Sequence, residues 1–99
     1  MWRHGDVIIA AVEQLPEEVI PENGATLAYG EVTGHSHRFA DPSAIELFRG
    51  LDGLLYLKVI ADVADLIHEE HHTLTIPRGL YRVWQQREYS PEAIRRIVD

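Results

Sequence analysis

Short apolar segments separated by turn residues dominate the hydrophobic pattern of the N-terminal half. Residues 7–12 are an apolar and partly β-branched run, which is typical of a buried strand. Residues 15–24 form a connection that contains the turn-favouring pair Asn23–Gly24. Apolar and polar positions then alternate with a period of two over residues 26–39, and small residues gather on one face. This alternation predicts a single strand that bends or approaches another backbone closely where the small residues lie.

Two hairpins are predicted further along the chain, each with apolar runs on either side of a turn that contains glycine. The first joins residues 45–48 to residues 54–60. The second joins residues 73–76 to residues 80–89 across Pro77-Arg78-Gly79. Both turns carry the residues that interrupt regular strands, so we expect the chain to reverse direction at each of them.

Residues 59–72 and the C-terminus complete the pattern. Residues 59–72 fit a helical stripe as well as a strand, and we favour a strand for their histidine-rich part. Ser90, Pro91 and Glu92 supply an N-cap residue, a first-turn proline and a first-turn acid, which predict a C-terminal helix. The elements together predict a mainly β fold: a small β-barrel or sandwich of about six short strands followed by a helix.

The length indicates a single domain spanning residues 1–99, and the composition, with 45% hydrophobic and 25% charged residues, is that of a globular protein. The chain has no cysteine, no apolar signal segment and no run near the roughly 20 apolar residues of a membrane span. We therefore expect a cytoplasmic protein with no membrane partner. A chain this short has a small core, so we also expect a homodimer that buries apolar residues such as Trp2, Phe48 or Trp84.

The formal net charge of −7 argues against a large nucleic-acid-binding surface, which would need an excess of Lys and Arg. It still allows a small nucleotide or oligonucleotide held by a few arginines, because the guanidinium group binds phosphate through paired hydrogen bonds. The substrate-binding candidates are Arg38, Arg87 and Tyr89, and Arg78 and Arg82 are further anion-binding candidates. Each of these residues is also compatible with an ordinary surface or packing role.

Histidine carries the most specific signal, because five of the six histidines lie in two short segments. His35 and His37 form the first cluster, and His68, His71 and His72 form the second. Histidine titrates near neutral pH and is the commonest metal ligand. We predict that both clusters converge on one site. The alternative is that each cluster is a solvated strand end or an exposed loop.

The second cluster, His68-Glu69-Glu70-His71-His72, formally contains the H-E-x-x-H motif of zinc peptidases. That motif needs a helix, on which Glu69 would be the general base. The residues that follow, 73–77, are β-like and end in a proline, so we disfavour a peptidase. On a strand, His68, Glu70 and His72 would share one face and His71 would point to the other. His4 would join the site if the N-terminus folds over it.

Four segments of the chain resemble a family of small histidine-rich prokaryotic and phage proteins. They are residues 4–7, 30–37, 68–71 and 87–91. That family is similar to ring nucleases, which degrade cyclic oligoadenylate signals in antiviral defence. The resemblance implies a catalytic role for a set of five histidines: His4, His35, His37, His68 and His71.

Three functions are compatible with these residues. The first is a hydrolase of RNA-like phosphodiesters, including small cyclic oligonucleotides, that needs no cofactor and uses histidines as general base and acid. The second is a cupin-like protein that binds a first-row divalent metal through His35, His37 and one or two of Glu70, His71 and His72, with Glu70 and His72 as the preferred pair. The third is a non-enzymatic interaction module. The residues alone favour the metal site, whereas the resemblance favours the hydrolase, which we take as the working hypothesis.

Overall fold

A computed structural model describes residues 1–30 and 34–86 of the chain. It contains eight strands and one short 3-10 helix: β1 (Trp2–His4), β2 (Val7–Ala11), β3 (Val19–Glu22), β4 (Thr26–Tyr29), β5 (Ser36–Phe39), η1 (Pro42–Ala44), β6 (Ile45–Gly50), β7 (Leu55–Ile67) and β8 (Leu74–Gln85). The mainly β class is therefore confirmed. Two of the strands are long, and the number exceeds the six short strands expected. The predicted C-terminal helix lies outside the described residues.

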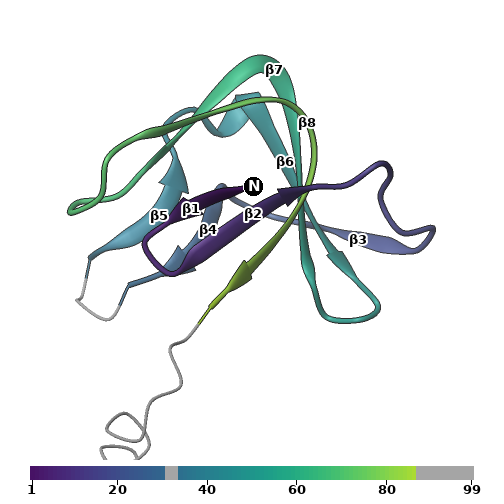
Figure 1. Ribbon diagram of the computed structural model, residues 1–99. Helices are drawn as coiled ribbons and strands as arrows, with labels where there is room; N and C mark the ends of the chain where they lie inside the picture. The colour runs from purple at the N-terminus through teal and green to yellow at the C-terminus, as the bar shows by residue number, and fades with distance from the viewer. Residues whose placement is uncertain (31–33, 87–99) are drawn as a thin grey trace, which may run out of the picture.

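All eight strands belong to one open antiparallel sheet with the order β1-β2-β8-β7-β5-β4, and β6 joins β3 to β7 off this path. Strand β7 organises the sheet because it pairs with three others. It pairs with β8 over most of its length, with β6 along its N-terminal half and with β5 at its C-terminal end. Figure 1 shows the β7–β8 hairpin arching over the molecule, with its turn on the side of β1 and β5.

A break in register bends this long hairpin. Val59 pairs with Gly79, but the next pair is Val63 with Pro77, so β7 carries extra residues at this point. Such bulges bend a strand and tolerate proline and glycine, which weaken a regular ladder. The predicted hairpin turn at residues 77–79 is therefore wrong: the chain continues as β8 through Pro77-Arg78-Gly79.

Two other expectations need correction. The single strand predicted over residues 26–39 is a pair of antiparallel strands, β4 and β5, in which Tyr29 pairs with Ser36. The predicted connection contains β3, whose residues pair with β6. The hairpin formed by β6 and β7 is confirmed, with Leu47 paired to Leu57. The small residues placed on one face of a bent strand thus mark a change of strand instead of a bend.

The ambiguous segment 59–72 divides at Ile67. Strand β7 extends only to Ile67. Residues 68–73 connect β7 to β8, so the strand predicted for the histidine-rich part is wrong, and the histidines of the second cluster lie neither on a strand nor on a helix. Without a helix, the H-E-x-x-H spacing does not produce the zinc-peptidase geometry.

The buried side chains of the strands form one hydrophobic core. Its largest fully buried side chains are Ile9, Leu57, Leu66, Ile76, Val7 and Val59. Full burial of such a side chain contributes roughly 1.5–3 kcal/mol. Within residues 1–30 and 34–86, the buried polar residues are His4, Ser36 and His37. Burying a polar side chain costs free energy unless it is hydrogen-bonded, so most polar residues stay at the surface. The three buried polar residues therefore indicate a region that is built for more than packing. No helix in this part of the chain has the length and apolar character to cross a membrane.

Candidate functional site

The pairing of β5 with β7 brings the two histidine clusters together. Arg38 pairs with Ile67 and Phe39 pairs with Leu66. Extending this antiparallel register by one residue places His37 opposite His68. The centroids of their rings are 4.4 Å apart, and the His35 and His68 rings are 5.6 Å apart. The predicted convergence of the clusters is confirmed.

His71 and His4 complete a cluster of five imidazoles. His71 comes from the same turn as His68, and its ring lies nearly parallel to that of His37, at 16° and 5.5 Å. His4 is the last residue of β1, and its ring lies 5.0 Å from that of His37 and 5.5 Å from that of His71. We call His4, His35, His37, His68 and His71 the histidine cluster. They are the five residues that the resemblance indicates.

Gly5 allows the N-terminal hairpin to approach the cluster. It follows His4 with a φ of +62°, as glycine does at the first position of a II′ turn. A Cβ atom on this residue would lie 2.6 Å from His71 Nε2 and 3.1 Å from His37 Cε1. This role of Gly5 does not follow from the histidine pattern. Its sequence signal is the Gly5–Asp6 pair directly before an apolar strand, which is a hairpin-turn sequence.

Two hydrogen bonds hold the buried part of the cluster. His4 Nε2 lies 2.7 Å from the carbonyl oxygen of His72, and His4 Nδ1 lies 2.9 Å from His37 Nδ1. Burial lowers the pKa of His4, and burial followed by the charges of His68 and His4 lowers the pKa of His37 to about 4. Both rings are therefore neutral at pH 7 and retain lone pairs.

The carboxylates around the cluster have different roles. Asp6 Oδ1 lies 3.5 Å from His37 Nε2. Glu69 is held on β5: one oxygen accepts the Ser36 N–H at 3.0 Å and the other lies 2.8 Å from Arg38 Nη1. The Ser36 N–H, together with the Arg38 guanidinium, lowers the pKa of Glu69 to about 2. Glu69 thus fastens the 68–73 turn to β5, and it is not placed as a general base.

Three imidazoles of the cluster form a donor set. One ring nitrogen from each of His37, His68 and His71 lies within 4.8 Å of the other two. Three histidines with one open coordination position are typical of catalytic zinc sites. A second set, His35, His68 and Glu69, meets the same distance criterion. It is the weaker set, because Arg38 already neutralises Glu69.

The metal ligands predicted from strand alternation are only partly brought together. His37 belongs to the first donor set, and His35 belongs to the second. Glu70 is exposed and lies 3.9 Å from His35 Nδ1. His72 meets the cluster through its carbonyl oxygen and its side chain is exposed, whereas His71 is a member of the first set. Strand alternation does not predict the ligands of the second cluster, because Glu70, His71 and His72 lie in the turn between β7 and β8.

The hydrogen bond of His68 determines where its proton lies. His68 Nδ1 accepts the backbone N–H of Glu70 at 3.0 Å. A neutral imidazole has one N–H, so neutral His68 carries its proton on Nε2. A metal that binds His68 must displace either this proton or this hydrogen bond.

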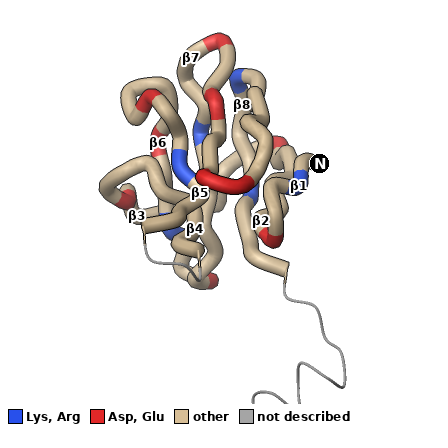
Figure 2. Tube along the Cα trace, turned by 90° about the vertical axis from the view of Figure 1, so that its left-hand side faces the viewer, with Lys and Arg blue, Asp and Glu red and all other residues tan. Residues whose placement is uncertain are grey.

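The predicted substrate-binding residues do not form an anion site in the described part of the chain. Arg38 donates to the Ser36 carbonyl and contacts Glu69. Arg78 pairs with Asp62, and the Arg82 guanidinium lies 4.5 Å from the centroid of the Trp84 ring. Arg87 and Tyr89 lie outside the described residues. Figure 2 shows Lys and Arg dispersed among acidic positions in that view.

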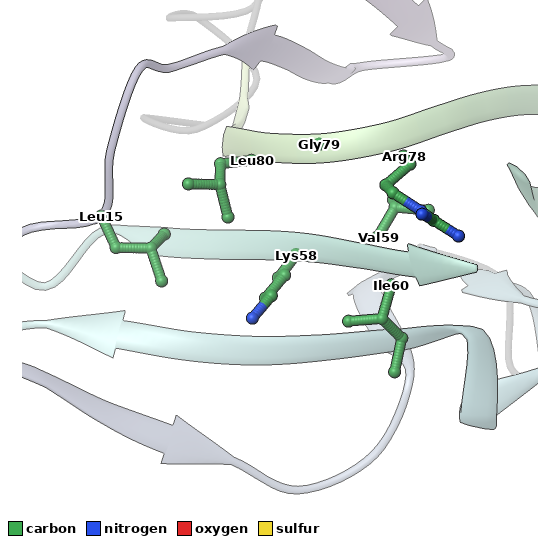
Figure 3. A pocket seen from close by; sticks show the side chains of 7 residues that line it. All are labelled: Leu15, Lys58, Val59, Ile60, Arg78, Gly79 and Leu80. Carbon is green, nitrogen blue, oxygen red and sulfur yellow. The ribbon is translucent and has the colours of Figure 1, made fainter. Parts of the chain in front are cut away.

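An open groove of about 560 Å³ lies along the middle of β7 and β8. Leu15, Ile60 and Leu80 give it apolar walls, and Lys58 and Arg78 also line it (Figure 3). No member of the histidine cluster lines it. The groove and the cluster are therefore separate features of the same hairpin.

Comparison with known proteins gives a family but no activity. Neither a curated protein nor a solved structure matches the chain. One family matches residues 3–86, a range that includes every member of the histidine cluster. The chain therefore belongs to the family described as a domain of unknown function (DUF8820).

Proposed function

We propose that this protein binds a first-row divalent metal ion, with zinc as the best fit, through His37, His68 and His71. The observation that carries the proposal is the convergence of three imidazole nitrogens within 4.8 Å of one another. Imidazole is a preferred ligand of zinc, copper, iron and nickel.

The local charges also favour a cation. His37 is neutral at pH 7, so it offers a lone pair without first losing a proton. The carboxylates of Asp6 and Glu70 lie beside His37 and His35. The nearby Arg38 is paired with Glu69 and does not oppose a bound cation with a free positive charge.

The proposed centre supports hydrolysis. Three protein ligands would leave a fourth position for water, and a bound zinc ion would lower the pKa of that water to about 7. We propose phosphodiesters as the substrate class, including the small cyclic oligonucleotides suggested by the sequence resemblance. A bound metal supplies the positive charge that such a substrate requires.

A metal-free phosphodiesterase is the second candidate, and the nearness of two imidazoles favours it. Neutral His37 has an unprotonated nitrogen that can act as the general base, and the ring centroid of His68 lies 4.4 Å from that of His37. The general acid of such a mechanism is a cationic imidazolium, so His68 would have to carry a proton on both nitrogens to fill that role. This mechanism also requires a cation for the transition-state charge, and the pairing of Arg38 with Glu69 makes it the weaker candidate.

The test starts from untagged protein stripped of metal by a chelator. We expect calorimetric titration with zinc to show one ion per chain, and His71→Ala to weaken this binding by at least about 100-fold. His72→Ala is the matched control: it removes an adjacent imidazole but keeps the backbone carbonyl that His4 contacts, so binding should persist. Equal zinc binding by both variants would contradict the proposal.

Catalysis is tested separately on ribose and 2′-deoxy oligonucleotides, linear and cyclic. Zinc-dependent cleavage of both kinds supports the metal hydrolase. Chelator-resistant cleavage restricted to ribose substrates supports the second candidate. Zinc binding without any cleavage would leave a metal-binding protein, and neither binding nor cleavage would leave an interaction module.

We further propose that the protein acts as a cytoplasmic homodimer. Trp2 packs against Tyr81 at 5.5 Å between ring centroids, and Trp84 is partly buried. These aromatics are therefore largely used within the chain, and a dimer would have to bury other apolar residues, such as the exposed Ile20 and Tyr29. Light scattering at micromolar concentration measures the assembly, and a mass of 11.3 kDa would exclude the dimer.

A further inference from the structure

His4 occupies the middle of a hydrogen-bonded chain that runs through three separate segments. Its Nε2 lies 2.7 Å from the carbonyl oxygen of His72 in the β7–β8 turn. Its Nδ1 lies 2.9 Å from Nδ1 of His37 on β5. His4 and His37 are 2% and 3% exposed, so water does not offer either ring an alternative partner.

The donors and acceptors available in these groups determine the direction of both hydrogen bonds. The His72 carbonyl can only accept, so His4 Nε2 must donate. A neutral imidazole has a single N–H, so His4 Nδ1 then bears a lone pair and must accept from His37. The proton of His37 consequently lies on Nδ1, and Nε2 is the nitrogen left free.

We propose that His4 is a positioning residue that holds His37 in the Nδ1–H form and directs its Nε2 to the metal. This inference rests on the proposed metal-binding function. It assigns to His4 a role different from that of a ligand or a catalytic residue. Histidine ligands of metals usually donate their second N–H to a carbonyl or carboxylate group, and here another histidine takes that place.

Asp6 does not by itself favour this tautomer. In the metal-free protein the unprotonated Nε2 of His37 lies 3.5 Å from Asp6 Oδ1, and a cation bound at Nε2 would relieve the repulsion between the lone pair and the carboxylate. If neutral His37 were protonated on Nε2 instead, one contact of His4 would be repulsive. With the His4 proton on Nε2, the unprotonated Nδ1 atoms of His4 and His37 would face each other. With the His4 proton on Nδ1, the lone pair of His4 Nε2 would face the carbonyl oxygen of His72.

Nuclear magnetic resonance of the metal-free protein tests the tautomers without reference to metal binding. Long-range nitrogen–proton correlation at pH 7 should show His37 protonated on Nδ1 and His4 protonated on Nε2. Detection of His37 protonated on Nε2, or on both nitrogens, would overturn the inference. Because no metal is present, this result is independent of the proposed function.

Two substitutions of His4 then test its effect on the site. His4→Asn keeps an oxygen near the position of Nδ1, where it can accept from His37, and His4→Leu removes the acceptor. We expect His4→Leu to bind zinc about 10–100-fold more weakly than His4→Asn, the usual effect of losing a partner of a ligand. The cobalt spectrum of His4→Asn should match that of the wild type.

Equal zinc affinities in the two variants would refute the positioning role, provided that the wild type binds zinc. Should His4→Leu fail to fold, His4→Asn with a weakened affinity and an altered cobalt spectrum would refute it as well. If the wild type binds no zinc, the proposed function fails, and the resonance experiment still decides which tautomer His4 imposes.

Discussion

The β7–β8 hairpin contains two polar interruptions, and they differ in how they treat charge. At the bulge in its middle, Arg78 forms an exposed ion pair with Asp62 beside the groove. At its turn, the imidazoles of His68 and His71 pack against the buried ring of His37. Exposed ion pairs contribute little to stability, whereas buried polar groups are costly unless partners are provided. The turn, and not the bulge, therefore contributes to a buried polar site whose side chains need partners from several strands.

The largest difference between the two regions should appear in zinc affinity. His71→Ala removes a donor, and we expect the affinity to fall by at least about 100-fold, beyond the usual effect of losing an indirect partner. Arg78→Ala should leave the affinity unchanged. Calorimetric titration of both variants measures the difference, and a similar loss in each would abolish the distinction.

Acid should destabilise the metal-free protein through the cluster. The pKa of His37 is about 4 in the folded chain and 6.5 in the unfolded chain, so below pH 6.5 the unfolded state binds more protons. The free energy of unfolding is therefore unaffected by His37 above pH 6.5, falls as the pH is lowered from 6.5 toward 4, and stops falling on account of His37 below pH 4. The difference amounts to about 3 kcal/mol at most.

Urea unfolding at a series of pH values measures this effect. The carboxyl of Glu69, whose pKa is lowered to about 2, acts in a separate window below its usual value of 4.5. Asp62→Asn should not alter the curve between pH 6.5 and 4.5. His37→Asn should flatten it, and an unchanged slope in that variant would show that His37 is not the group responsible.

Gly5→Ala should lower stability by about 1–3 kcal/mol, because alanine is strained at a φ of +62° and its Cβ meets His71. Gly24→Ala is the matched control: Gly24 also has a positive φ, but no atom lies within 4 Å of its Cβ position. Both variants lose backbone freedom, but only Gly5→Ala should also weaken zinc binding. Thermal unfolding with and without zinc separates the two contributions.

The smallest effect is expected at the bulge. Asp62→Ala removes the partner of Arg78 at an exposed position, and the free energy of unfolding should change by less than about 1 kcal/mol. Chemical denaturation in low and high salt measures it. A larger loss would mean that the bulge, like the turn, depends on its polar contacts.

The sequence predicts which histidines converge better than it predicts the backbone that holds them. Each of two short segments carries several imidazoles, so one contact between the segments, the pairing of β5 with β7, is enough to bring them together. Alternation along a strand wrongly separated His71 from His68, since both lie in a turn. Pro77 and Gly79 predict a reversal of the chain, but a bulge on β7 accommodates both residues within β8. Neither the register of β7 nor the buried position of His4 follows from local pattern, because both depend on pairings between distant segments.

The bond between His4 and the carbonyl of His72 joins residues 68 positions apart, and the bond between His4 and His37 spans 33 positions. In a chain without cysteine, a metal held by His37 and the 68–73 turn would close long loops much as a disulfide does. The unfolded chain has no such arrangement, so the ion would stabilise the folded state in proportion to its concentration relative to the dissociation constant. Since His4 bonds to His37 and to the carbonyl of His72, strand β1 would be fixed in place only after β5 and the β7–β8 turn have formed. Metal binding would then slow proteolysis by lowering the population of unfolded molecules.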